Sequence, residues 1–273
     1  MQIHSQEIRE SGATIAFVPT MGFLHEGHLS LMRMARSLAD HLVVSIFVNP
    51  TQFGPGEDFK VYPRDIDQDS KKVKTEGVDT LFLPNTVELY PSTFETYIRL
   101  ESLTKRLCGR FRPHHFAGVA TIVAKFFNIV RPNIAIFGKK DYQQWLIIRR
   151  MVHDLNMNIE IIGAPIVRES DGLALSSRNS YLKKEERIKA LSLYKTLTTA
   201  EKKVAAGAQD AVVIIQEAVD GISAHEGVAI DYVSICDPET LDDVTEINKP
   251  VLMALAVKVG KTRLIDNLLL TPS

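Results

Sequence analysis

The chain contains several short apolar runs that do not alternate with polar residues. Five of them are rich in β-branched or aromatic side chains: TIAFVP (14–19), HLVVSIFVN (41–49), TLFLP (80–84), IAIFG (134–138) and IEIIGAPIV (159–167). Continuous apolar runs of this length are typical of strands buried on both faces, as in a parallel sheet that helices cover on both sides.

Helical patterns separate these runs. Apolar residues recur every three or four positions in 28–40, 116–130 and 141–156. The alternation of strands and helices predicts an α/β fold with an open, Rossmann-like, doubly wound parallel sheet.

The pattern changes after about residue 168. A loop rich in Ser and Gly, ESDGLALSSRNS (169–180), precedes long charged helices at about 184–206 and 209–221. Two strand-like runs follow at 229–237 and 250–259, and the segment RLIDNLLL (263–270) comes after them. We therefore expect a Rossmann-like domain over residues 1–168 and a smaller C-terminal α+β domain over 169–273, which acts as a lid together with the Ser- and Gly-rich loop.

The amino-acid composition argues against several classes of function. The 273 residues carry 32 Lys+Arg and 33 Asp+Glu, a net charge of -1, so no overall positive field favours nucleic acid or an anionic membrane. No apolar run approaches the roughly 20 residues that span a bilayer, and no signal-peptide pattern is visible. Cys108 and Cys236 stand far apart, which suggests neither a disulfide framework nor a zinc site. We expect a cytoplasmic protein.

The stretch PTMGFLHEGH (19–28) is a candidate anion site. A helix that begins near Gly27, after a buried strand, points backbone N–H groups and its positive end beyond the carboxyl edge of the sheet. His25 and His28 add donors that can stabilise charge developing on a phosphate. A lone histidine would more often be a cap or a packed residue, whereas this pair favours function. The stretch lacks both the GxGxxG and the GxxxxGK[ST] pattern.

Amide side chains follow the second strand. Asn49 and Gln52 lie in a loop where they can hydrogen-bond a hydroxylated small molecule, although Asn-Pro alone also marks a turn. In GRFRPHHFAGV (109–119), helix capping explains most of the polar residues, and only Arg112 stands out as a candidate substrate-binding residue.

Two further segments carry positive charge. Lys139 and Lys140 precede a helix, where the positive end of the helix disfavours them unless an anion is bound. The loop LALSSRN supplies Ser176, Ser177 and Arg178, and the guanidinium can clamp a polyphosphate with two hydrogen bonds. An ordinary linker remains the alternative for this loop.

The order of these motifs along the chain resembles that in nucleotidyl-transferring α/β enzymes and in class I aminoacyl-tRNA synthetases. A closer resemblance is to the pantothenate synthetase, or pantoate–beta-alanine ligase, family. It rests on VPTMGFLHEGHLSL, SIFVNPTQF, YPRD, RPHHFAGVATIV, FGKKDYQQ, VRESDGLALSSRN and RLIDN, which follow one another from about residue 14 to residue 267.

The resemblance implies a reaction and its participants. ATP activates pantoate as an enzyme-bound pantoyl adenylate, beta-alanine then forms the amide of pantothenate, and AMP and pyrophosphate are released for the coenzyme A pathway. Mg2+ accompanies ATP without direct protein ligands, and the enzyme is a homodimer.

The resemblance also implies roles for individual residues. His28 matches the proposed proton donor, and Gln52 and Gln144 match pantoate-binding residues, with Gln52 also beside beta-alanine. On physical grounds, the charge on the phosphate oxygens and on leaving pyrophosphate can be shared by His25, His28, Lys140, Ser176, Ser177 and Arg178. The matched ATP contacts are Met21, Gly22, Phe23, Leu24, His25, Glu26, Gly27, His28, Gly138, Lys139, Lys140, Asp141, Val167, Leu175, Ser176, Ser177 and Arg178.

Three features depart from the family pattern. Lys139 stands where the family has Glu, His114 stands where Gly is commoner, and the stretch before the first strand looks shortened. Two other functions stay open at this point. A nucleotidylyltransferase would need more basic residues around its acceptor, and a nucleotide-binding regulatory module would leave the paired glutamines without a role.

Overall fold

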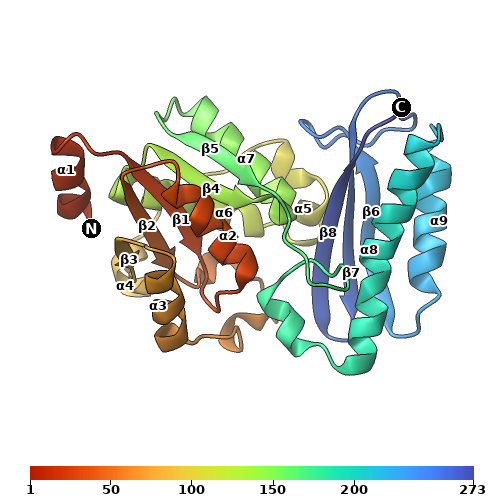
Figure 1. The fold of residues 1–273 in the computed structure, drawn as a ribbon, viewed down its shortest axis with the longest axis horizontal. Helices are drawn as coiled ribbons and strands as arrows, with labels where there is room; N and C mark the ends of the chain where they lie inside the picture. The colour runs from red at the N-terminus through yellow and green to blue at the C-terminus, as the bar shows by residue number, and fades with distance from the viewer. The chain divides into compact units, whose positions relative to one another are not determined.

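The computed structural model describes all 273 residues, which form two compact units (Figure 1). Unit 1 comprises Met1–Thr104, Arg112–Lys139 and Gln144–Ile166, and unit 2 comprises Lys105–Phe111, Lys140–Gln143 and Val167–Ser273. The functional division into an ATP- and pantoate-binding domain and a lid domain stays a prediction. None of the helices combines the length and the apolar character that crossing a lipid bilayer requires.

Unit 1 is built on five parallel strands in the order β3-β2-β1-β4-β5. Their bounds are β1 Ile15–Thr20, β2 His41–Ile46, β3 Thr80–Phe82, β4 Ile134–Gly138 and β5 Glu160–Ala164. This order confirms the predicted doubly wound parallel sheet. The strand order reverses between β1 and β4, and ligands of such sheets bind outside the carboxyl ends of the strands at that point.

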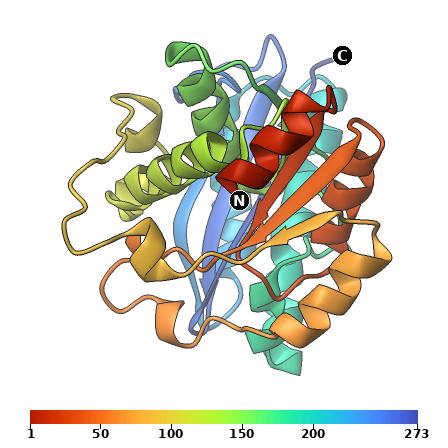
Figure 2. The ribbon, with the colours of Figure 1, turned by 90° about the vertical axis from the view of Figure 1, so that its left-hand side faces the viewer.

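Helices cover both faces of this sheet, and alternate residues of β1 point to opposite sides. Ala16 and Val18 belong to an apolar cluster with Met32 of α2 (Glu26–Arg36). Phe17 points the other way, and its ring centre lies 5.8 Å from that of Phe126 in α6 (His115–Val130). Figure 2 shows these two helices on either side of the strands. Burial on both faces explains why the strands read as unbroken apolar runs.

The remaining elements of this region include some that the pattern did not predict. The predicted helix 141–156 is α7 (Tyr142–Asp154). The unpredicted helices are α1 (Gln2–Glu10), α3 (Ile66–Thr75) and α4 (Thr86–Leu89). Short 3-10 turns are η1 (Pro50–Gln52), η2 (Asp58–Lys60), η3 (Leu103–Lys105) and η4 (Lys139–Asp141).

Unit 2 is an antiparallel sheet covered by two helices, which confirms the predicted α+β class. The strands β6 (Val228–Cys236), β7 (Val251–Val259) and β8 (Thr262–Leu270) lie in that order. The helices α8 (Lys184–Ala205) and α9 (Ala211–Ser223) lie side by side (Figure 1); α8 packs on β7 and β8, and α9 packs on β6. The 3-10 turn η5 (Ser177–Tyr181) contacts β8, and the short helix α5 (Cys108–Phe111) also belongs to this unit.

Candidate active site

The turn after β1 has a backbone that requires glycine. Gly22 has φ of 81°, and a Cβ atom there would lie 2.9 Å from Cγ2 of Ile46. Phe23 follows, also with a positive φ of 51°. A positive φ raises the conformational free energy of residues other than glycine, so contacts with the rest of the protein must hold Phe23 in this conformation.

Asp69 of α3 provides those contacts. Its Oδ2 accepts a hydrogen bond from Phe23 N and its Oδ1 accepts one from Leu24 N, both at 2.7 Å, and the residue is only 2% exposed. Lys72 Nζ donates to Leu24 O at 2.6 Å. These two N–H groups of the turn are therefore bound to a protein carboxylate.

Sequence reasoning missed Asp69, although a signal was present. Asp69 and Val73 are four positions apart in α3 and are the two buried residues of that helix. An acidic residue on the apolar side of an amphipathic helix points inward, where it needs hydrogen-bond donors.

His25 and His28 meet at the start of α2. His25 N donates to His28 Nδ1 at 3.3 Å, and the two ring centres are 4.0 Å apart. Because Nδ1 accepts, the neutral His28 ring carries its proton on Nε2 and can donate it to a ligand. The helix begins at Glu26, so the N–H groups of Glu26 and Gly27 have no intrahelical acceptor. The turn before the helix is bound to Asp69, so the part of the predicted anion site that is left to bind an anion is the first turn of α2.

Asn49 holds the side chain of Gln52. Asn49 Nδ2 donates to Gln52 Oε1 at 3.1 Å and to Gly118 O at 3.2 Å, and the two amide residues are 1% and 9% exposed. Gln52 Nε2 lies 3.2 Å from Met21 Sδ. The structure therefore brings three predicted site residues together and makes Asn49 a support for Gln52.

Arg112 supports the same loop. Arg112 Nη2 donates to Gln52 O at 3.1 Å, and its Nε donates to Glu57 Oε1 at 2.7 Å. Partial burial acts to raise the pKa of Glu57, but the hydrogen bonds and charge of Arg112 outweigh it and hold that pKa below its ordinary value. His115 Nδ1 also lies 2.9 Å from Gln52 O. A contact between Arg112 and substrate stays a prediction.

The lysine pair is divided between two environments. Lys139 Nζ lies 5.1 Å from the centre of the Trp145 ring, a cation–π contact within unit 1. Lys140 Nζ lies 3.2 Å from Asp141 Oδ2 within unit 2. Helix α7 begins only at Tyr142, so both lysines precede it in the η4 turn, and each has a partner in the protein.

The neighbouring glutamines also differ. Gln143 is 6% exposed; its Oε1 accepts from Cys108 N at 3.0 Å and its Nε2 donates to Arg106 O at 2.8 Å. These bonds fasten 105–111 to the start of α7, which gives Gln143 a structural role. Gln144 is partly exposed. The departure at His114 is harmless to the backbone, since φ of -98° and ψ of -12° suit any residue.

The segment before the Ser-Ser-Arg motif is a small hairpin. Leu175 N donates to Val167 O at 3.0 Å, and Arg168 pairs with Ala174 in an antiparallel bridge. Ser176 caps η5 by accepting a hydrogen bond from Arg178 N at 3.3 Å. The hairpin thus places two predicted ATP contacts, Val167 and Leu175, next to each other.

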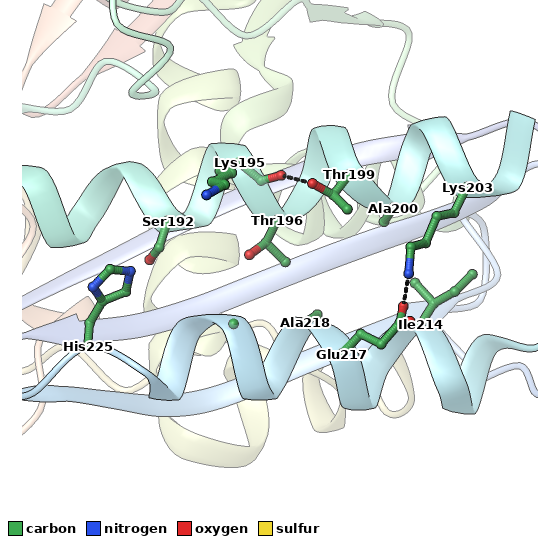
Figure 3. Close-up of a pocket in the computed structure, with 11 residues that line it drawn as sticks. Ser192, Lys195, Thr196, Thr199, Ala200, Lys203, Ile214, Glu217, Ala218 and His225 are labelled. Carbon is green, nitrogen blue, oxygen red and sulfur yellow. Dashed lines mark hydrogen bonds and ion pairs between the residues drawn. The ribbon is translucent and has the colours of Figure 1, made fainter.

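A groove of about 180 Å3 lies between α8 and α9 (Figure 3). Its polar side chains include an ion pair between Lys203 and Glu217. None of the predicted site residues lines it. The groove is therefore separate from the predicted chemistry.

The predicted site residues are shared between the two units. Unit 1 carries Met21–His28, Asn49, Gln52, Arg112, Gly138, Lys139 and Gln144, and unit 2 carries Lys140, Asp141, Val167 and Leu175–Arg178. Their convergence around one triphosphate stays a prediction.

Comparison with known proteins identifies the family. The family model described as pantoate-beta-alanine ligase matches residues 1–269. The chain belongs to this family. It is 57% identical over 272 residues to a pantothenate synthetase of Desulfatibacillum aliphaticivorans, covering 100% of this chain and 97% of the relative. It is 55% identical over 270 residues to one from Thermotoga petrophila, covering 99% and 96%.

Solved structures of proteins from the same family also match this chain. The crystal structure of pantothenate synthetase from Thermus thermophilus has a TM-score of 0.93 and 44% identity, covering 98% of both chains. That of the Francisella tularensis pantoate-beta-alanine ligase, complexed with beta-gamma ATP and beta-alanine, has a TM-score of 0.81 and 36% identity, covering 98% of this chain and 95% of that one. The predicted enzyme class, a ligase that joins pantoate to beta-alanine, is confirmed.

Proposed function

We propose that this ligase works in two steps through a bound pantoyl adenylate. In the first step, a carboxylate oxygen of pantoate bonds to the α-phosphorus of ATP, and pyrophosphate leaves with the electrons of the broken P–O bond. In the second step, the amine of beta-alanine bonds to the acyl carbon, AMP leaves, and the nitrogen loses a proton. No protein nucleophile takes part. Family membership and the relative complexed with beta-gamma ATP and beta-alanine support this sequence.

The observation that carries the assignment is the contact of His25 N with His28 Nδ1. It sets the neutral tautomer that carries the proton on Nε2, and we assign Nε2–H of His28 the role of donor to the charge that develops on the α-phosphate. His25 is the second donor at this position. Lys140, Ser176, Ser177 and Arg178 share the charge of the phosphates and of leaving pyrophosphate.

Pantoate is positioned by the glutamines Gln52 and Gln144. Holding two reactants in line contributes roughly 7–11 kcal/mol toward the barrier of such a reaction. Asn49 and Arg112 act on substrate mainly through Gln52, since their side chains bond its amide oxygen and its carbonyl. Beta-alanine attacks beside Gln52, and excluding water from the site protects the acyl adenylate from hydrolysis.

Mg2+ enters this proposal with ATP, as part of the substrate. The ion is commonly held by substrate phosphates together with one or two carboxylates and water. The chain gathers no group of three His, Cys, Asp or Glu side chains that could hold a metal ion. Within this proposal the enzyme is a cytoplasmic homodimer. Sedimentation equilibrium at micromolar concentration should give twice the chain mass of 30.5 kDa, and a monomer would contradict the dimer.

The decisive experiment is pantoate-dependent exchange of labelled pyrophosphate into ATP, run without beta-alanine. The wild-type enzyme should exchange, because the adenylate forms reversibly before the amine reacts. His28→Ala should abolish exchange while the circular dichroism spectrum stays unchanged. His153→Ala, at a side chain that is 82% exposed, is the matched control and should exchange normally. Normal exchange in folded His28→Ala would remove His28 from the mechanism.

A further inference from the structure

The motif RLIDN (263–267) has no part in the proposed chemistry, yet two of its polar side chains are buried. It lies on β8, at one edge of the unit 2 sheet. Asp266 and Asn267 in this motif are 3% and 6% exposed. Buried polar groups need hydrogen-bond partners, so the partners of these two side chains indicate what the motif does.

Asn267 bonds the main chain of the lysine. Its Nδ2 donates to Lys140 O at 2.9 Å. Lys140 lies in the η4 turn, and this partly buried hydrogen bond to its carbonyl fixes the orientation of that peptide plane. The base of the Lys140 side chain is thereby fixed relative to β8.

Asp266 holds the hairpin that leads to the Ser-Ser-Arg motif. Its carboxylate accepts two hydrogen bonds from Arg168, at 2.6 and 2.9 Å, in a bidentate pair. Arg168 also donates to Gly172 O at 3.1 Å, across the turn of the hairpin. Asp266 Oδ1 accepts a further hydrogen bond from Asn267 N at 2.8 Å, which joins the two anchors.

We propose that Asp266 and Asn267 are positioning residues for the ligase reaction. Strand β8 sets the place of Lys140 and of the segment Ser176–Arg178 relative to each other, because Asn267 bonds the main chain of Lys140 and the adjacent Asp266 holds, through Arg168, the hairpin that leads to Ser176. This inference rests on the proposed function of Lys140 and Arg178. Neither Asp266 nor Asn267 touches substrate in this account.

The first test is Asn267→Ala in the exchange assay. Misplacement of a reacting group by about 1 Å can cost on the order of 100-fold, so kcat should fall about 10–100-fold with little change in the KM for pantoate. Asn128→Ala is the matched control, since it loses a similar bond, from Asn128 Nδ2 to Ala124 O, and should keep the wild-type rate.

A double-mutant cycle separates positioning from a general structural role. If Asn267 acts through Lys140, Asn267→Ala should have almost no effect in a Lys140→Ala background, measured with labelled pyrophosphate. Losses that multiply would overturn the inference, as would a wild-type rate in folded Asn267→Ala. Should Asn267→Ala unfold, Asn267→Asp keeps the shape and replaces the donor with an acceptor, and it should give the same loss. Unfolding of both variants would also overturn the inference.

The second test concerns the other anchor. Asp266→Asn should raise the KM for ATP about tenfold, Arg168→Lys should do the same, and the double variant should be no worse than either. An unchanged KM in folded Asp266→Asn would overturn this part of the inference. Two other results would contradict the proposed function itself and not only the positioning role. They are a wild-type exchange rate in Lys140→Ala, and no exchange by the wild-type enzyme.

Discussion

At the scale of single residues, the turn after β1 depends on one buried carboxylate. Asp69 fixes Phe23 and Leu24 by two hydrogen bonds, and these residues lead directly into His25. A negative charge close to the proposed triphosphate site would cost electrostatic energy. The two hydrogen bonds that Asp69 makes to the turn act against this cost.

Replacement of Asp69 tests this balance. Hydrogen bonds to charged groups contribute about 1.5–3 kcal/mol each, so Asp69→Ala should lower the free energy of unfolding by a few kcal/mol. The KM for ATP should rise, because His25 and His28 lose their support. Urea unfolding and initial rates measure the two effects.

A neighbouring carboxylate provides the control for that experiment. Asp65 caps α3 by accepting from Gln68 N at 3.0 Å, and Asp65→Ala should cost about 1 kcal/mol without changing the KM for ATP. A lower KM in Asp69→Ala would contradict the anchoring role, since relief of charge repulsion would then dominate.

The sequence predicted those site residues whose partners lie only a few positions away in the chain. His25 and His28 are three positions apart after an apolar strand, so their pairing could be predicted from the motif alone. Asp69 and Asn267 act on partners 45 and 127 positions away, at Leu24 and Lys140, and no local pattern links them. Such contacts depend on tertiary packing.

At the scale of elements, α6 and η1 approach each other closely beside Gln52. A Cβ atom on Gly118 would lie 2.5 Å from Thr51 O and 2.8 Å from Gln52 N. The glycine therefore sets how near the helix can approach the loop that carries Gln52.

Gly118→Ala should push these two elements apart. Overpacking of this kind costs about 1–3 kcal/mol, and kcat/KM for pantoate should fall because Gln52 moves with the loop. Gly221→Ala in α9 is the matched control, since nothing lies within 4 Å of its added Cβ atom. It should raise stability by about 0.4–1 kcal/mol and leave kinetics unchanged. Wild-type kinetics in Gly118→Ala would show that the loop adjusts.

The ion pair between Glu57 and Arg112 gives the same loop a pH dependence. The pKa of Glu57 is lowered below its ordinary value of 4.5 in the folded protein. Its contribution to stability is therefore present above pH 4.5 and is lost as the pH falls through the folded pKa. Glu57→Gln should be less stable than wild type by about 1.5–3 kcal/mol at pH 7. Urea unfolding should show this difference shrinking toward pH 3, and an equal difference at both pH values would contradict the assignment.

Elements were predictable where burial leaves a strong pattern. The five strands of unit 1 lie within the predicted runs, give or take a residue, because both faces of each inner strand are covered. Helix α3 was missed because its sequence, IDQDSKKVKT, is mostly polar and has only two buried residues. The fold places it beside the turn after β1 through Asp69, a contact that amphipathic periodicity alone does not reveal.

At the scale of the whole molecule, the two compact units do not follow a single cut in the chain. Lys105–Phe111 and Lys140–Gln143 belong to unit 2, although the rest of that unit begins at Val167. Gln143 fastens these two short segments to each other through Cys108 and Arg106. A boundary read from a change in sequence texture near residue 168 cannot show such exchanges, because each segment is only a few residues long.

The predicted lid can be tested by limited proteolysis with trypsin. The hairpin is fastened to its own unit by Arg168, and by Arg187, which pairs with Glu169 and Asp171. We therefore expect it to move with unit 2 and not as a free flap. Cleavage after Arg178 should be slow without ligand and slower still with ATP. Equal rates with and without ATP would contradict the lid.

The bond between Asn267 and Lys140 has a consequence for how the enzyme is made. Lys140 is synthesised near the middle of translation. Its carbonyl can accept the hydrogen bond from Asn267 only after β8, the last strand, has been synthesised and has left the ribosome. A nascent chain that stalls before that point holds its lysine without the anchor. Competence for ligation is thus acquired late, and premature termination just before the codon for Asn267 should yield inactive polypeptide.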